Sequence, residues 1–493
     1  MPAEIEHVRA ECGRKSLNGE GEALIRPVII PGLGVVLMMC AGAAASLRAG
    51  AAPGTGHVAR TLYVSAGGND ANAGTISEPL ATPVKAVGEA AAGDSICIRS
   101  GVYYLNRPLL IDKPGLTVRS FDGELAHLKA PIDEGKGVTS VIVVAASDVA
   151  LAGLEVEGGS FYGIKIDSEP GRSTSGVSIR GCRIHDTGRD CIKTFNADRL
   201  SIQGCEIGPS GKRDPSDAEG IDSIGSVGVV IQRCWIHDTA TNGLYLKGGA
   251  RDGIVEQCRI ENISGFAGIL LGEDTDQEFM RDGSRYEAIN CIARNNIVIN
   301  TGAAGLATYS GSNIRFENNT LYHVAENKQA AFWIVTNSRN VPAEHIALIN
   351  NIAAMSGSRP FVLIQNLAGR LDCDYNIYFD SGGWHKKKFV SETTGTLERY
   401  DQWSFADWQR IKGVDSHSIM ADPLLDAEDS YTPLPGSPAI GRGKAPPGPY
   451  TDYQGAVPLK DTRWNIGAVQ RRAVTGARGV NFLLSLRNLQ GMP

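Results

Sequence analysis

Several common signatures of function are missing from this sequence, and their absence narrows the classes of protein to which it can belong. It has no glycine-rich nucleotide-binding loop, no zinc-ligand spacing and no Ser-His-Asp set. Its 48 basic residues are outnumbered by 54 acidic ones, and the net charge of −6 is spread along the chain. The sequence therefore predicts neither a nucleic-acid nor a nucleotide partner. An anionic substrate would need a locally positive site.

Helical periodicity is also missing from the middle of the chain, where a short phrase recurs instead. One position of the phrase is cysteine four times and then asparagine three times, 23 to 38 residues apart: Cys182, Cys205, Cys234, Cys258, Asn296, Asn319 and Asn351. Such a period is typical of a solenoid, in which each coil buries its apolar side against its neighbours. Because short strand patterns alternate with turns, we predict an all-β fold, a single-stranded right-handed parallel β-helix.

The ten cysteines suggest a disulfide framework, but their placement argues against one. Four of them occupy the same slot of successive coils, so their side chains should be parallel, which is poor disulfide geometry. We expect buried, free thiols.

The first 52 residues read as a leader. No charged residue occurs between Pro27 and Leu47, and a compact apolar run follows Arg26. This pattern predicts a secretory signal, and the run is also about long enough for an uncleaved membrane anchor. We therefore expect a secreted or cell-envelope protein.

The remaining chain divides by composition. We predict a β-helix over residues 60–380, an irregular insertion over 381–418, a closing segment over 419–472 that packs on the helix and wraps its C-terminal end, and a tail over 473–493. A short capping helix is expected near the start, with Thr82 as N-cap, Pro83 in the first turn and Gly93 as C-cap.

The two ends of the predicted helix resemble known proteins. The opening Tyr63-Val-Ser-Ala-Gly-Gly-Asn-Asp, with the capping helix after it, resembles the start of many bacterial right-handed β-helix proteins, including polysaccharide lyase family 9. Asp422-Pro-Leu-Leu, Ser437-Pro-Ala-Ile and Asn465-Ile-Gly-Ala-Val resemble the closing segment of such proteins.

Acidic residues gather on one predicted face. A second series of strands begins at glycines or at Cys191, and alternate side chains must point outward. Counting along the coils places Asp190, Glu219 and Asp222 on neighbouring coils, with Asp217 in the loop before them as a fourth candidate metal ligand. Carboxylates this close repel one another unless they are protonated or bind metal, and oxygen ligands from turns suit Ca²⁺. A solvated polar face is the alternative.

The resemblance to family 9 extends to these residues. It implies a calcium cluster at Asp190, Glu219 and Asp222, with Glu219 in place of an aspartate, and a lysine base at Lys247, one coil further on. The implied reaction is calcium-assisted β-elimination in an acidic, uronate-containing polysaccharide. Lys193, Tyr245 and Arg251 are the expected substrate contacts, and we expect a monomer.

Two other functions stay open: a uronate C5-epimerase and a non-catalytic protein that binds glycan through the solenoid face. His185 and His237 are interpreted as turn-capping residues on a different face. No pair of aspartates matches the glycosidase pattern of polygalacturonases, which share the predicted architecture.

Overall fold

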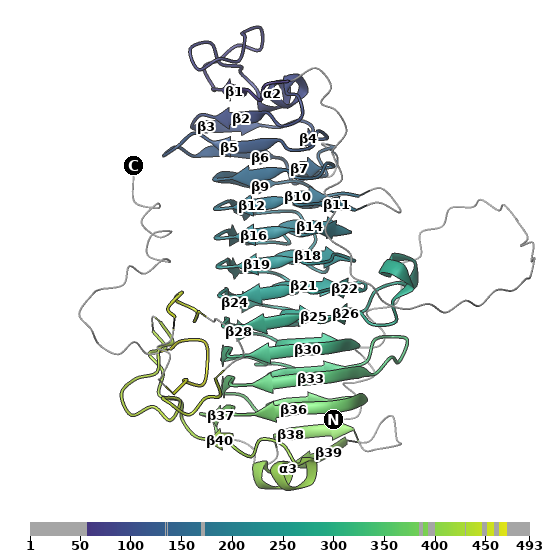
Figure 1. Ribbon diagram of the computed structural model, residues 1–493, viewed down its shortest axis with the longest axis vertical. Coiled ribbons are helices and arrows are strands. Elements are labelled where there is room, and N and C mark those ends of the chain that lie inside the picture. Colours follow the sequence, from purple (N-terminus) through teal and green to yellow (C-terminus); the bar gives the residue numbers. More distant parts are fainter. Residues whose placement is uncertain are drawn as a thin grey trace, which may run out of the picture. The chain divides into compact units, whose positions relative to one another are not determined.

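The chain is wound into a parallel β-helix (Figure 1). The computed structural model describes residues 57–470 except 134, 136, 169–172, 384–387, 393–399, 429, 446–450 and 458–462. The predicted leader and tail therefore lie outside the described residues. No helix in the described part of the chain is long and apolar enough to cross a membrane.

Each coil contributes one strand to each of three sheets, here called sheets I, II and III in chain order within a coil. In the described part of the chain, sheet I has 14 strands and sheets II and III have 12 each, and a separate pair joins β11 (Thr174–Ser175) to β15 (Ala197–Asp198). Strand pairing is parallel throughout the three sheets except between the last two strands of sheet III, β38 and β39. The prediction of an all-β parallel β-helix is confirmed.

Sheet I contains β1 (Thr61–Val64), β2 (Ser95–Ile98), β5 (Thr117–Ser120), β8 (Ala150–Ala152), β12 (Ser178–Arg180), β16 (Ser201–Gln203), β19 (Val230–Gln232), β22 (Ala250–Arg251), β23 (Ile254–Glu256), β26 (Ala288–Ile289), β27 (Ile292–Arg294), β30 (Gly311–Glu317), β33 (Ala343–Ile349) and β36 (Leu367–Asp374). Sheet II contains β3 (Gly101–Tyr104), β6 (Ala126–Ala130), β9 (Leu154–Gly158), β13 (Arg183–His185), β17 (Glu206–Ile207), β20 (Trp235–His237), β24 (Arg259–Ile263), β28 (Ile297–Thr301), β31 (Thr320–Tyr322), β34 (Ile352–Met355), β37 (Ile377–Asp380) and β40 (Ile419–Met420). Sheet III contains β4 (Leu109–Ile111), β7 (Ser140–Val144), β10 (Tyr162–Ile166), β14 (Ile192–Phe195), β18 (Ile221–Ile224), β21 (Leu244–Lys247), β25 (Ala267–Leu271), β29 (Ala304–Tyr309), β32 (Phe332–Val335), β35 (Val362–Ile364), β38 (Phe389–Glu392) and β39 (Tyr400–Trp403).

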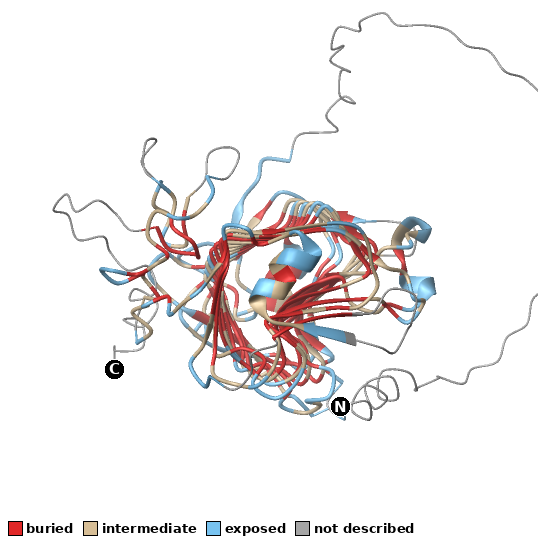
Figure 2. Ribbon diagram, turned by 90° about the horizontal axis from the view of Figure 1, so that it is seen from below, coloured by how far each residue is buried: buried red, intermediate tan, exposed pale blue. Residues whose placement is uncertain are grey.

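The core runs along the axis of the coils. Viewed end-on, buried residues line the inside of the three sheets (Figure 2). Ile192, Ile221 and Leu244 follow one another on paired strands of sheet III, and each is fully buried. The inward positions that the strand period predicts are therefore the ones that fill the core.

The cysteine and asparagine slot lies at the turn between sheets I and II. Cys182, Cys205, Cys234 and Cys258 are buried and free, as expected. In the asparagine part, Asn296 Nδ2 donates to Asn319 Oδ1 at 3.0 Å, and Asn319 Nδ2 donates to Asn351 Oδ1 at 3.1 Å. Asn351 Nδ2 donates to Asn376 Oδ1 at 3.2 Å, which adds one rung to the ladder.

A helix covers each end of the stack. Helix α2 (Pro83–Glu89) begins as predicted, because Thr82 Oγ1 accepts a hydrogen bond from Lys85 N at 3.2 Å. It ends earlier than predicted, with Ala90 rather than Gly93 as its C-cap. Helix α3 (Phe405–Lys412) lies at the other end (Figure 1) and buries Trp408 in the core, where its ring stacks on Phe389.

Two expectations for the C-terminal part need correction. The segment 381–418 is not simply irregular, because β38 extends sheet III and α3 covers the end of the core. The segment 419–472 packs on the helix, but along the side of sheet II rather than around the end (Figure 1). Tyr431 and Val469 cover Ile297 and Ile299, outward residues of β28 that would otherwise expose apolar surface to water.

Candidate functional site

Three acidic side chains meet on the outer face of sheet III. Asp190 and Glu219 stand in the turns that lead into β14 and β18, and Asp222 is on β18. Each offers a carboxylate oxygen, and these oxygens lie within 4.8 Å of one another. All three residues are buried, and Asp222 has no exposed surface. The structure thus brings together three of the four predicted metal ligands; we call them the acidic cluster.

The hydrogen bonds of the acidic cluster leave two oxygens without a partner. Asp190 Oδ1 accepts from Glu219 N at 3.0 Å, while Glu219 Oε1 accepts from Thr241 Oγ1 at 2.5 Å and from Asn242 Nδ2 at 3.2 Å. Glu219 Oε2 and Asp222 Oδ1 are buried and have no hydrogen-bond partner among the described residues. A buried carboxylate oxygen without a partner is costly unless a proton or a cation meets it.

Burial governs the protonation of the cluster. It raises the pKa of Asp190 well above its usual value, and the neighbouring Glu219 raises it further. Burial also raises the pKa of Glu219, with the Asp222 carboxylate as the next cause. These shifts show that the site disfavours three full negative charges in the absence of a compensating cation.

One compensating charge comes from Lys193 on β14, which pairs with β18 so that Lys193 lies opposite Asp222. Its ammonium group donates to Asp222 Oδ2 and lies 3.8 Å from Asp190 Oδ2. Burial lowers the pKa of Lys193, but Asp222 and Asp190 outweigh burial and raise the pKa above its usual value. Lys193 was predicted as a substrate contact; here it is a partner of the acidic cluster.

The donor set of the acidic cluster fits a hard divalent cation. Three ionised carboxylates and one ammonium sum to −3 + 1 = −2, which a dication would neutralise. The two unpaired oxygens, on Glu219 and Asp222, are the kind of ligand that such ions take. The predicted fourth ligand does not join them, because Asp217 is 60% exposed at its side chain and forms an ion pair with Arg189 at 2.9 Å.

Lys247 lies at the end of β21, which pairs with β18, the strand of Asp222. Figure 1 shows the two strands side by side. Its Nζ is 2.5 Å from Oε2 of Glu273, 3.4 Å from the carbonyl oxygen of Asp274 and 4.4 Å from the centre of the Tyr245 ring. Burial lowers the pKa of Lys247, yet Glu273, with a smaller contribution from Asp222, holds the pKa above its usual value. The amine is therefore held in the charged form in this state.

Glu273, the partner of Lys247, is a residue that the repeat did not single out. Burial raises the pKa of its carboxyl to about 7, against the opposing effect of Lys247. It stands at the start of the 272–287 insertion, where no repeat fixes the direction of a side chain. The sequence did hold one signal for Glu273: it follows the strand in the coil next to that of Lys247.

The remaining predicted substrate contacts divide between two sheets. Tyr245 lies opposite Asp222 on the outer face of sheet III and is nearly fully buried. Arg251 is on β22 of sheet I, where its Nη1 is 3.8 Å from Asp282 Oδ2. The structure therefore places Tyr245 beside the acidic cluster and does not place Arg251 on the same sheet.

Aromatic side chains stand at both ends of the strands beside the acidic cluster, with Phe161 before β10 and Phe195 at the end of β14. Phe161 is contacted by the guanidinium groups of Arg189 and Arg213, at 4.9 and 4.6 Å from its ring centre. At the other end, Phe279 from the 272–287 insertion packs edge-on against Phe195 of β14, with ring centres 6.0 Å apart. The Arg189 guanidinium also pairs with Asp214 at 2.7 Å and with Asp217 at 2.9 Å.

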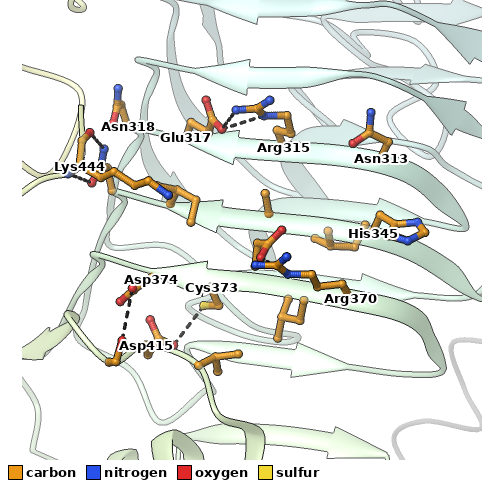
Figure 3. A pocket seen from close by; sticks show the side chains of 18 of the residues that line it. Asn313, Arg315, Glu317, Asn318, His345, Arg370, Cys373, Asp374, Asp415 and Lys444 are labelled. Atoms are coloured by element: carbon orange, nitrogen blue, oxygen red, sulfur yellow. Dashed lines mark hydrogen bonds and ion pairs between the residues drawn. The ribbon is translucent and has the colours of Figure 1, made fainter. Parts of the chain in front are cut away.

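A separate groove lies on sheet I, at β30, β33 and β36 (Figure 3). It has a volume of about 950 Å³, and Lys444 from the C-terminal segment lines one side. Its basic residues are already paired in part, since Arg315 donates to Glu317 at 2.8 Å and Arg370 forms an ion pair with Asp372. It lacks a cluster of unpaired buried carboxylates, so we locate the candidate chemistry on sheet III.

Comparisons with known proteins agree with this architecture. A family model described as "Right handed beta helix region" matches residues 136–282 and 171–353. Among solved structures, pectate lyase Pel9A is 14% identical, with a TM-score of 0.56 over 84% of this chain and 97% of that one. XylC, solved in complex with xylose, is 11% identical, with a TM-score of 0.51 over 84% of this chain and 98% of that one. No curated protein matches the sequence.

The family model describes a right-handed β-helix, and the solved structures share its architecture. The chain is a right-handed parallel β-helix whose fold resembles that of polysaccharide lyase family 9. At these identities the likeness concerns the fold, and chemistry must be argued from the residues themselves.

Proposed function

We propose that this chain is an exported polysaccharide lyase that cleaves an acidic, uronate-containing polysaccharide by β-elimination, with Lys247 as the base and Ca²⁺ at the acidic cluster. One observation carries the proposal: three buried carboxylates with two unpaired oxygens lie on the same sheet as a partly buried lysine, one strand away. Asp190, Glu219 and Asp222 would hold the ion. Bound there, Ca²⁺ would neutralise the uronate carboxylate and acidify the proton at C5.

The protein's own residues would perform the proton transfer. Lys247 Nζ, as a neutral amine, takes the C5 proton; the C5–H electrons form the C4–C5 double bond and the C4–O bond breaks. The departing oxygen takes a proton from solvent. Because Glu273 favours the charged amine through the contact at 2.5 Å, this carboxyl must take a proton from solvent before Lys247 can act as a base.

Positioning of the substrate is assigned to groups around the cluster. Tyr245 supports Lys247 through its ring, and Phe161 with Arg189 and Phe279 with Phe195 would bound the sugar chain on two sides. Export is assigned to the leader in residues 1–52, by its apolar run alone.

The experiment that tests the proposal is a substrate panel of pectin, alginate, rhamnogalacturonan and glycosaminoglycans, assayed with Ca²⁺ or with chelator. A lyase produces an unsaturated uronate that absorbs in the ultraviolet, and the signal should require Ca²⁺ and Lys247. Lys165→Ala is a matched control. Lys165 is on β10, on the same face of sheet III, where it lies opposite Lys193 of β14 and forms an ion pair with Asp167. Absence of product on every polymer, with Ca²⁺ present, would refute the lyase for that panel.

Two other outcomes would point to the alternatives. Exchange of the C5 proton with solvent deuterium without an unsaturated product would indicate a uronate C5-epimerase. Polymer affinity without turnover, unchanged in Lys247→Ala, would indicate a glycan-binding surface protein. The groove on sheet I, with its acidic and basic side chains and Lys444, supports this last candidate.

A further inference from the structure

Two histidines lie on either side of an acidic strand in sheet II, away from the acidic cluster on sheet III. His127 is on β6, Glu155 and Glu157 are on β9, and His185 is on β13. Strand pairing sets His127 opposite Glu155 and His185 opposite Glu157. The two imidazoles therefore face the Glu-Val-Glu segment from opposite sides, with ring centres 6.3 Å apart.

The nitrogen and oxygen atoms of these residues converge. His127 Nε2 is 2.9 Å from Glu157 Oε2, and His185 Nε2 is 3.1 Å from Glu155 Oε1. One ligand atom from each of His127, Glu157 and His185 lies within 4.8 Å of the others. This is the type and number of protein ligands found in three-ligand transition-metal sites.

The orientation of each imidazole favours a ligand role. His185 Nδ1 is 2.8 Å from Asp186 Oδ2 and its Nε2 is 3.1 Å from Glu155 Oε1, so both ring nitrogens face carboxylates in this structure. Asp186 can keep the proton on Nδ1 when Nε2 coordinates an ion in place of its contact with Glu155. His127 Nε2 is buried and makes no hydrogen bond of acceptable geometry, despite its short distance to Glu157. The Nε2 atom of His127 is therefore available as a ligand on the same side as Glu157 Oε2.

Basic residues around His127, His185 and the two glutamates pair with one oxygen of each glutamate and leave the other oxygen to face a metal ion. Lys129 Nζ is 2.6 Å from Glu157 Oε1, and Arg183 Nη1 is 2.9 Å from Glu155 Oε1. The Oε2 atoms of both carboxylates face His127 instead, at 2.9 Å from its Nε2 and 3.7 Å from its Nδ1. Lys129 and Arg183 balance the two glutamates, so affinity must come from imidazole coordination, which selects Zn²⁺-like ions over Ca²⁺.

We propose that His127, His185 and Glu157 form a binding site for a divalent transition-metal ion of the Zn²⁺ class, with Glu155 as an adjacent carboxylate and Asp186 as the residue that positions His185. The ion would join three successive strands of sheet II. The site is distinct from the acidic cluster in its sheet and in its ligand chemistry.

The test uses the full chain, stripped of metal and held in excess Ca²⁺ so that the acidic cluster is not available to the probe. Titration with Zn²⁺ followed by calorimetry should show one tight site, and Co²⁺ should give visible absorption bands typical of nitrogen-containing coordination. His127→Gln and His185→Gln should each abolish the tight site. Asp186→Asn should weaken Zn²⁺ binding by about 10- to 100-fold, since loss of an outer carboxylate disturbs the ligand without removing it.

His237 provides the matched control. It lies on β20 of the same sheet with Asp238 at 2.7 Å from Nδ1 and Glu206 at 3.7 Å from Nε2, but belongs to no group of metal-binding residues among those described. His237→Gln should therefore leave Zn²⁺ binding unchanged. Wild-type protein without a tight Zn²⁺ site, or equal loss in His237→Gln and His127→Gln, would overturn the proposal. A cooperative thermal transition checks that each variant is folded, and His127, the more exposed imidazole, tests the site even if His185→Gln does not fold.

Discussion

Lys247 and Glu273 form a partly buried ion pair, with Nζ 2.5 Å from Oε2, at the position where the proposed reaction needs a neutral amine. The side chains are 14% and 17% exposed, so water screens the contact only weakly. The pair keeps the pKa of Lys247 high and is itself sensitive to pH, because the pKa of Glu273 is about 7.

Glu273→Gln should move lyase activity to lower pH. Removing the carboxylate removes the main cause that raises the pKa of Lys247, so a larger fraction of the amine is neutral at a given pH. A shift of one pKa unit changes that fraction by about tenfold. The measurement is kcat/KM against pH, and the ascending limb should move toward acid. Glu278→Gln, an exposed acid of the same insertion, is the control and should leave the profile in place.

Lys247→Ala should lower kcat by about 10²- to 10⁴-fold, the usual contribution of a general base. Its effect on calcium binding should be small, because Lys247 forms no hydrogen bond or ion pair with the acidic cluster among the described residues. Calorimetry with Ca²⁺ measures the second quantity. If Lys247→Ala retained full turnover on a polymer that the wild type cleaves, another group would have to be the base.

Stability without calcium should fall as pH rises. The pKa values of Asp190 and Glu219 are raised in the folded state, so the folded protein binds more protons than the unfolded chain above their ordinary values. This contribution is complete at acid pH and is lost as pH rises through the folded-state values. Thermal unfolding at a series of pH values measures the trend.

Calcium should reverse the loss of stability. At a concentration a hundred times Kd it would add about 2.7 kcal/mol to the free energy of unfolding. Asp222→Asn should lose this gain, whereas Asp217→Asn should keep it, because Asp217 pairs with Arg189 outside the cluster. A calcium-independent melting temperature in the wild type would contradict the site.

Asn319→Ala should destabilise the protein more than Cys205→Ala. Asn319 Oδ1 and Nδ2 bond to Asn296 and Asn351, so truncation leaves buried polar groups without partners, at about 1–3 kcal/mol each. Cys205 loses only a small apolar contact, at about 1 kcal/mol. Urea unfolding of both variants gives the comparison, and equal losses would show that the asparagine ladder adds nothing to packing.

The sequence alone was sufficient to predict the coils of the β-helix and the residues of the acidic cluster, and both predictions have the same physical basis. The strand period of two and the recurring slot at Cys182 set which residues face outward, and Asp190, Glu219 and Asp222 stand a short count from that slot. Lys193 was placed on the correct face, but its contact with Asp222 depends on a flexible side chain that no backbone period constrains.

What lay in insertions could not be read from the repeat. Glu273 and Asp217 both belong to segments without a period, so neither the contact with Lys247 nor the contact with Arg189 was accessible. The course of the C-terminal segment did have a signal: the outward positions of sheet II change from Glu206 and Arg259 to Ile297 and Ile352 along the paired strands. An outward face that becomes apolar predicts that another segment of the chain packs on it, as the C-terminal segment does.

The change from cysteine to asparagine between Cys258 and Asn296 should make the two halves of the stack differ in their resistance to being pulled apart. Beyond that point, separating two coils breaks side-chain hydrogen bonds between amides as well as the strand ladder, whereas before it the thiols offer only weak contacts with backbone oxygens at about 3.6 Å. Under tension the N-terminal coils should therefore part first. Asp190, Glu219 and Asp222 all lie in that weaker half, where an ion held between neighbouring coils would fasten the chain at the place it is most easily pulled apart.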